Sequence, residues 1–248
     1  MKNSIYFYVI IVILTVILTS CKSFSQNNEG KAGPQTNSVK ITGEMKNVMW
    51  KGELYGTIDI DTISDKEHLY GLGPVEYLRG EIIIVDGRGY KSTVINDSTM
   101  DVSETLKLKA PIFAYANIEN WTESNLPDNI LSMSALEKFL DQNSSDIKKP
   151  FLFKLTGTAD SAEIHIVNLE EGSIVSSPEE AHKGQKNFII KDKRIELVGF
   201  YSTEHKAIFT HHDTNIHIHL ITEDKKQMGH LEKIDLKKGT VKLYLPKQ

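Results

Sequence analysis

Cysteine is nearly absent from this sequence, because Cys21 is the only one in 248 residues. A disulfide framework within the chain is therefore excluded. A basic excess is also missing, since 29 Lys and Arg are opposed by 33 Asp and Glu. No Lys/Arg stripe interleaved with aromatic residues occurs, which argues against a nucleic-acid partner and favours a small-molecule one. No internal repeat is visible, and 40% apolar residues predict an ordinary globular fold.

The one long apolar run lies at the N-terminus, over residues 5–18, and Lys2 precedes it. Small residues follow the run and lead to Cys21, a pattern typical of a secretory signal peptide and rather short for a permanent span. The letters Leu-Thr-Ser-Cys also resemble a bacterial lipobox. That resemblance implies a signal peptide over residues 1–20 and lipidation of Cys21. The alternative is an uncleaved N-terminal anchor, and both alternatives predict a domain held outside the cytoplasm at a membrane, as in a bacterial lipoprotein.

Residues 21–40 are rich in Ser, Asn, Gln and Gly, which predicts a flexible tether behind the lipidated cysteine. The folded part is expected to comprise two packed β-rich halves, residues 41–145 and 146–248. Short segments of alternating apolar and polar residues predict an α+β fold that is mostly β, with mixed or antiparallel sheets and a few helices. The expected strands are 53–60, 81–85, 90–95, 111–118, 151–156, 163–167, 194–201, 215–222 and 240–245.

Two kinds of local signal refine this expectation. Asp86-Gly87 predicts a tight turn between two strands. Ser134 and Glu137 suggest an N-cap and a capping-box partner for a helix over residues 134–143. A second, shorter helix is expected over residues 177–183.

Histidines concentrate near the C-terminus, where five of the nine lie between positions 211 and 230. Because strand side chains alternate faces, His217 and His219 should point the same way while the intervening isoleucines face a core. His230 follows beyond a polar turn, at a distance that suits a hairpin. Three histidines with an open position are typical of catalytic zinc, although a half-exposed strand with histidines facing water fits the pattern equally well.

Glu81 precedes an almost wholly apolar run and is the other candidate site residue. A nearby cation would keep such a carboxylate ionised, whereas pairing with Arg79 or with solvent is the simpler interpretation. His211 and His212 are interpreted as polar loop residues. His68, His182 and His205 have no constellation around them and are interpreted as surface residues.

The segment from His217 to Asp224, followed by Gly229-His230, is similar to the metal-binding signature of acetolactate decarboxylases. Four further segments match the family in the right order, and the resemblance spans roughly residues 45–245. These segments are Lys51-Gly52 through Gly56, Gly71-Leu72-Gly73, Gly80-Glu81 with Asp86-Gly87, and residues 195–200.

The resemblance implies a β-rich, often dimeric enzyme that converts 2-acetolactate, or a related 2-hydroxy-3-oxo acid, to acetoin and CO2 through a metal-stabilised enediolate. It implies that His217, His219 and His230 bind zinc, or another divalent transition metal. It also implies that Glu81 reaches the metal site from the N-terminal half. No organic cofactor is expected, because a divalent cation can stabilise the charge that develops as CO2 leaves.

Three departures from the family pattern favour a second hypothesis. The family's substrate-handling arginine falls at or near His165, which has no guanidinium fork but can donate a proton. Gly73 is followed by Pro74-Val75 instead of the family's Gly-Thr-Phe pattern, and the family's C-terminal glutamate has no counterpart before Gln248. The alternative is therefore a non-catalytic extracytoplasmic lipoprotein that binds metal or a small ligand on the same scaffold.

Overall fold

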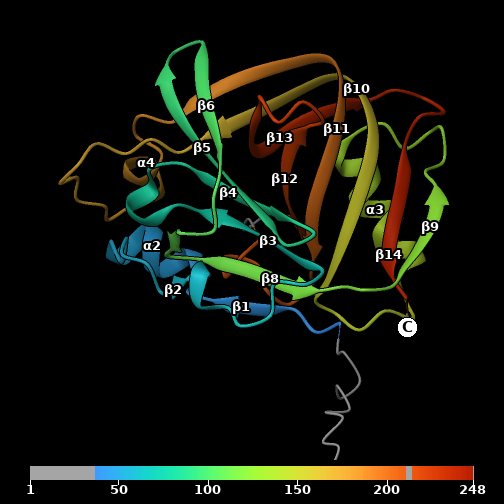
Figure 1. Cartoon of the computed structure of the whole chain (residues 1–248), viewed down its shortest axis with the longest axis horizontal. Helices are drawn as coiled ribbons and strands as arrows, with labels where there is room; N and C mark the ends of the chain where they lie inside the picture. Colours follow the sequence, from blue (N-terminus) through green and yellow to red (C-terminus); the bar gives the residue numbers. More distant parts are fainter. Residues whose placement is uncertain (1–36, 211–213, 248) are drawn as a thin grey trace, which may run out of the picture. The chain divides into compact units, whose positions relative to one another are not determined.

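The computed structural model describes residues 37–210 and 214–247, all within one compact unit. Figure 1 shows two large sheets, built from the first and the last parts of the chain. The described residues also form three α-helices. All pairings between the named strands are antiparallel. The predicted class, a mostly β fold with a few helices, is confirmed. The division at residue 145 stays a prediction.

The first sheet has six strands, in the order β1-β8-β3-β4-β5-β6. Their bounds are β1 (Lys40–Thr42), β3 (Leu69–Pro74), β4 (Glu81–Val85), β5 (Arg88–Asn96), β6 (Thr99–Glu104) and β8 (Phe113–Asn117). The β4–β5 connection is the predicted tight turn: Asp86 and Gly87 have φ of 48° and 79°. Positive φ at both central residues gives the turn that matches the twist of a hairpin.

The second sheet also has six strands, in the order β11-β12-β13-β10-β14-β9, with a further pairing of β11 with β10. Their bounds are β9 (Trp121–Asn125), β10 (Phe151–Ile166), β11 (Lys186–Tyr201), β12 (Ile216–Thr222), β13 (Met228–Leu236) and β14 (Lys242–Pro246). The strands predicted over 151–156 and 163–167 are one long strand. The polar stretch between them remains paired in the sheet, with Gly157 against the backbone of Thr240 and Val241.

The strand predicted over residues 53–60 is wrong apart from β2 (Ile58–Asp59), which pairs with β7 (Lys109–Ala110). A helix that the sequence patterns missed, α2 (Met45–Lys51), ends immediately before this segment at Gly52, where φ is 65°. The Leu54 carbonyl then accepts a hydrogen bond from the Tyr77 N–H at 2.7 Å. This hydrogen bond to the turn at residues 76–78 holds the segment after α2 as a loop.

Helix α3 (Met133–Asn143) forms where it was expected but with a different cap. Ser132, not Ser134, is the N-cap, and its hydroxyl accepts from the Ala135 N–H. Glu137 is not part of a capping box, because its carboxylate accepts from the Asn215 N–H at 2.9 Å. It thereby ties α3 to the start of β12. The short helix α4 (Pro178–Ala181) also forms as expected, with Ser177 as its N-cap.

Apolar side chains on the two faces of a strand pack into different hydrophobic cores. Leu136 and Leu140 of α3 pack with Ile216, Ile218 and Leu220 on one face of the second sheet. The opposite face packs against the first sheet in a core that contains Ile83, Leu152, Val198, Phe200 and Ile221. On β4, Ile82 and Ile84 turn the other way, into a third cluster around Phe113. The interface between the sheets is therefore where Glu81, Ile83, His217, His219 and Ile221 meet.

The turn between β12 and β13 is held by Asp224. Its carboxylate accepts hydrogen bonds from the Thr222 hydroxyl at 2.7 Å and the Lys226 N–H at 3.2 Å. The Thr222 hydrogen bond is the largest cause that lowers the pKa of Asp224 from 3.8 to about 2.

None of the described helices has the length and apolarity needed to cross a bilayer.

Asp224→Ala is expected to destabilise the fold by about 1 kcal/mol at neutral pH, because it removes several hydrogen bonds to a partly exposed carboxylate. The folded pKa lies below the unfolded value, so this stability is present above pH 3.8 and is lost as the pH falls through about 2. Urea unfolding at several pH values tests this, with Asp160→Ala as a surface control. A deficit that does not shrink with acid would contradict it.

Candidate metal centre

The histidines of β12 lie on the face of the strand that meets the first sheet. His217 and His219 are 5% and 0% exposed, while the alternating Ile216 and Ile218 pack under α3. The turn brings β13 back so that His230 stands directly opposite His219 in the register. The sequence pattern thus becomes a hairpin that buries three imidazoles between two sheets.

The three rings converge on one point. Nitrogen atoms of His217, His219 and His230 all lie within 4.8 Å of one another. The Nδ1 of His230 is 3.1 Å from the Nε2 of His217. Two ligands of a tetrahedral zinc ion, each bonded at about 2.0–2.1 Å, are separated by about 3.3 Å. This group therefore has the donor type and the spacing that a divalent transition ion requires.

Backbone carbonyls orient two of these rings. The Nδ1–H of His217 donates to the Phe209 carbonyl at 2.5 Å, and that of His219 donates to the Ile82 carbonyl at 2.8 Å. A carbonyl only accepts, so the proton sits on Nδ1 and each Nε2 keeps its lone pair. Metal-binding histidines commonly use such a contact to fix the tautomer and the ring orientation.

Glu81 arrives from the first sheet at the start of β4. It is 2% exposed, and its Oε1 accepts from the Val167 N–H at 3.2 Å. Its Oε2 lies 3.6 Å from the Nε2 of His219. Burial raises the pKa of Glu81 well above 4.5, although the Val167 hydrogen bond partly opposes this. The simpler interpretation, a strand-end carboxylate paired with Arg79, is wrong, because Arg79 pairs with Glu171.

The strongest evidence that a cation fits here is the environment of the Nε2 of His219. This nitrogen is buried without a hydrogen-bond partner, although polar atoms buried this deeply are nearly always paired. Burial, followed by the charge of His217, pushes the pKa of His219 well below 6.5, so the ring is neutral as a ligand must be. The 3.6 Å gap to Glu81 is too long for a hydrogen bond but close to the spacing of two ligands on one ion.

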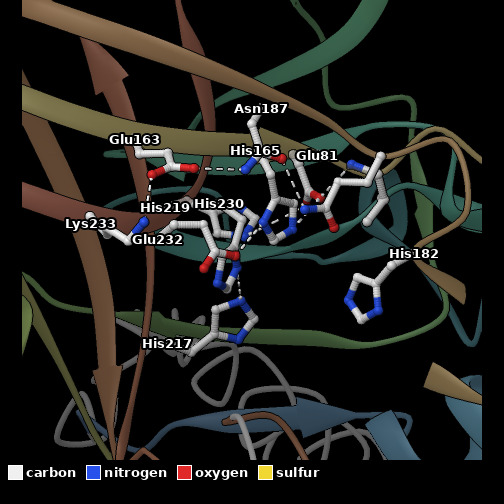
Figure 2. Close-up of polar contacts among 12 residues, drawn as sticks. Glu81, Glu163, His165, His182, Asn187, His217, His219, His230, Glu232 and Lys233 are labelled. Carbon is white, nitrogen blue, oxygen red and sulfur yellow. Dashed lines mark hydrogen bonds and ion pairs between the residues drawn. The ribbon is translucent and has the colours of Figure 1, made fainter. Parts of the chain in front are cut away.

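His165 lies beside this group on β10. It stands opposite His230 in the register, and the two rings stack with centroids 4.6 Å apart. Its Nδ1 is 2.6 Å from the Oε1 of Glu232, and its Nε2 is 3.9 Å from the Oε1 of Glu81. The residue at the expected arginine position therefore lies at the site. In Figure 2, His165 stands between Glu81 and Glu232, with His217 on the far side of His230.

A cavity of about 50 Å³ opens beside the cluster. That volume admits roughly one or two water molecules, so a larger ligand must displace flexible side chains such as Met45 and Met49 at its wall. No lysine or arginine lines the cavity among the described residues. The lining consists of Met45, Met49, Pro74, Leu78, Glu81, Ile112, His165, Val167, His182, His217 and His230.

The surface interpretation of His182 is therefore wrong. This residue caps the end of α4, where its ring lies edge-on to His165 with centroids 6.3 Å apart. Its Nδ1–H donates to the Pro178 carbonyl at 2.6 Å. No sequence signal placed it here, because only the tertiary position of a short helix brings it to the cavity.

Two other histidines, His68 and His205, take no part in the described site. His68 pairs with Asp86 at the β4–β5 turn, and His205 bonds the Ser202 hydroxyl. Both are only partly buried and neither lines the cavity. His211 and His212 lie outside the described residues, as does Cys21.

Comparison with known proteins identifies the family to which this chain belongs. A sequence model of alpha-acetolactate decarboxylase matches residues 42–247. The chain belongs to the alpha-acetolactate decarboxylase family. Its function is accordingly acetolactate decarboxylase-like, in a family of carboxy-lyases.

Individual relatives of this family are distant. Alpha-acetolactate decarboxylase of Brevibacillus brevis is 26% identical over 201 residues, which cover 81% of this chain and 67% of that protein. The Methanosarcina mazei enzyme is 24% identical over 91% of this chain and 81% of that protein. The crystal structure of acetolactate decarboxylase from Bacillus subtilis subspecies spizizenii aligns with a TM-score of 0.67 at 21% identity, over 85% of this chain and 86% of that one. The fold is therefore that of the acetolactate decarboxylases.

The glycine that precedes His230 has a packing role in this acetolactate decarboxylase fold. A Cβ at Gly229 would lie 2.5 Å from the His165 carbonyl oxygen, a backbone atom that cannot turn aside. Gly229→Ala is expected to push β13 away from β10, with a loss of about 1–3 kcal/mol from overpacking. Because the shift falls next to His230, metal affinity should fall as well. Thermal unfolding with and without zinc measures both effects.

Gly172→Ala is the control for that substitution, because a Cβ there would have no atom within 4 Å apart from those of the residue itself and its two chain neighbours. Its φ of 78° makes some backbone strain unavoidable, but that strain is remote from the metal centre. Equal zinc affinity in Gly229→Ala and Gly172→Ala would contradict the packing role.

Proposed function

We propose that this domain is a metal-dependent decarboxylase that converts 2-acetolactate, or a related 2-hydroxy-3-oxo acid, to acetoin and CO2. One observation carries the proposal: three imidazoles and the buried Glu81 surround a point where the Nε2 of His219 has no hydrogen-bond partner. Family membership supplies the reaction class.

His217, His219 and His230 would hold the ion, which we propose to be zinc because neutral imidazole is one of its preferred ligands. When bound, a divalent ion supplies a Lewis acid that stabilises the negative charge developing on the substrate as CO2 leaves. The chain's own contribution is then to fix the donor atoms, to exclude water and to place a proton donor.

Glu81 and His165 would have two different roles beside the ion. Glu81 offers a carboxylate whose buried charge is favourable only beside a cation. His165 presents its Nε2 to the same cavity and, when protonated at both ring nitrogens, would deliver the Nε2 proton to the substrate carbon that loses CO2. The apolar walls would limit competing access of water.

The direct test is CO2 release from racemic acetolactate by the purified chain, metal-free and then loaded with one equivalent of zinc. The proposal predicts release only after loading, and acetoin in equal amount. Absence of release at every metal loading, with zinc demonstrably bound, would refute the decarboxylase proposal.

One observation favours a second candidate, a metal-binding lipoprotein without catalysis. No described residue of the cavity wall is a lysine or arginine that would pair with a substrate carboxylate. If His217→Ala abolishes metal binding while the parent protein turns over no related acid, binding is the function.

We also propose that Cys21 carries a lipid that anchors the domain outside the cytoplasm. Metabolic labelling with a radioactive fatty acid tests this, since labelling should require Cys21 and disappear in Cys21→Ser. An unlabelled parent chain would refute lipidation of Cys21 and leave the decarboxylase proposal unaffected.

A further inference from the structure

We propose that Glu232 is a positioning residue that fixes the ring of His165, so that its Nε2 faces the cavity. This inference rests on the proposed function, in which His165 supplies the proton. It concerns a carboxylate that the sequence motifs did not single out, on the strand that also carries His230.

The contact between the two side chains is direct. The Nδ1 of His165 and the Oε1 of Glu232 are 2.6 Å apart, within the range of a charge-assisted hydrogen bond. The histidine side chain is 5% exposed and the glutamate side chain 37% exposed. Glu232 therefore reaches inward from the rim of the site and holds the outer nitrogen of a buried ring.

The other contacts of His165 do not fix its orientation, because its Nε2 lies 3.9 Å from the Oε1 of Glu81, too far for a hydrogen bond, and the remaining contacts are with rings. His230 stacks on one face at 4.6 Å with an interplanar angle of 21°, and His182 stands edge-on at 6.3 Å. Stacking restrains the plane of a ring but does not select which edge points inward. A flip of half a turn would exchange nitrogen for carbon at the cavity, and the bond to Glu232 opposes that flip.

An imidazole needs such a partner in a way that a guanidinium does not. Arginine presents five N–H donors around a planar fork, so several orientations still offer a donor. A neutral histidine has one donor and one acceptor nitrogen, and its partner decides which is which. A carboxylate at Nδ1 is thus the natural companion of a histidine at a position where the family is expected to have arginine.

A second metal ion is the competing explanation, because His165, His230 and Glu232 also form a group within reach of one ion. The 2.6 Å separation between His165 and Glu232 argues against it. Two ligands on one tetrahedral ion would be about 3.3 Å apart. The two side chains bond each other with no room for an ion between them.

The test compares Glu232→Leu, which removes the acceptor, with Glu232→Gln, which keeps an oxygen at the same position. Nitrogen-15 NMR of the histidine rings in the zinc-loaded full chain reports which nitrogen of His165 carries the proton. We expect a proton on Nδ1 in the parent and in Glu232→Gln, and loss of that preference in Glu232→Leu. The kcat of Glu232→Leu should fall by about 10- to 100-fold, with KM and zinc content unchanged.

Glu163→Gln is the matched control, because Glu163 sits on β10 and pairs with Lys233 on the neighbouring strand without touching His165. It should change neither the NMR signature nor kcat. An unaltered His165 signal in Glu232→Leu would overturn the proposal. So would a zinc content of two in the parent that falls to one in Glu232→Leu. A parent with no CO2 release but with the expected NMR change would refute the proposed function and leave the positioning role standing.

Discussion

His219→Asn is expected to remove metal binding and decarboxylation while leaving the metal-free fold intact. The amide NH2 of asparagine can replace the Nδ1–H that donates to the Ile82 carbonyl, but no atom replaces the Nε2. Loss of an outer-shell partner already costs about 10- to 100-fold in affinity, and loss of a ligand should cost more. Zinc titration with a competing chelator, together with CO2 release, measures both effects.

Two further variants separate ligand loss from damage to the fold. His219→Ala also leaves the Ile82 carbonyl without this hydrogen-bond donor and creates a cavity. It should therefore lower the free energy of unfolding by about 2–4 kcal/mol. His68→Ala removes a histidine that pairs with Asp86 away from the cavity and should bind zinc normally. Retention of parental zinc affinity by His219→Asn would show that this ring is not a ligand.

Glu81→Gln is expected to reduce metal affinity and activity sharply without weakening the metal-free protein. Glutamine keeps the side chain's size and an oxygen for the Val167 N–H. Burial raises the pKa of Glu81 well above 4.5 and so favours the neutral acid in the metal-free protein, a form that the amide imitates. Only the cation-bound state uses the charge, so zinc affinity should fall about 10- to 100-fold.

The same substitution has a pH signature. The folded pKa of Glu81 lies above its unfolded value of 4.5, so its contribution to stability is fully present below that value. The contribution is lost as the pH rises through the folded pKa. Metal-free parent protein should therefore lose stability relative to Glu81→Gln as the pH increases. Zinc should reverse this order, because ligand binding stabilises only the protein that holds it tightly.

Glu76→Gln provides the matched control, since Glu76 precedes the same strand but does not line the cavity. Unfolding curves at several pH values, with and without zinc, should coincide for this variant and the parent. If Glu81→Gln binds zinc as tightly as the parent, the carboxylate takes no part in the metal centre.

The features that the sequence predicted correctly are those that local rules determine. Alternation along β12 placed His217 and His219 on one face, and the polar turn fixed the hairpin that returns His230. The tight turn at Asp86 formed for the same reason, because two adjacent residues there have the backbone geometry that a hairpin needs. Such features depend on neighbouring residues alone.

The features that the sequence did not predict depend on contacts between distant segments. The family resemblance placed Glu81 at the site, but its own sequence neighbours did not, because it lies beside His219 through the packing of β4 across the second sheet, where the Ile82 carbonyl meets the imidazole. Glu137 looked like a capping residue, but the Asn215 N–H is its partner. His182 and Glu232 carry no motif, and packing alone brings them to His165.

The central claim is that three imidazoles share one ion. X-ray absorption spectroscopy at the zinc edge of the loaded full chain tests it directly. The structure predicts histidine nitrogens at about 2.0–2.1 Å with the multiple scattering of three imidazole rings and at least one oxygen ligand. A spectrum with no imidazole signature, or a protein that retains no zinc after dialysis, would contradict it.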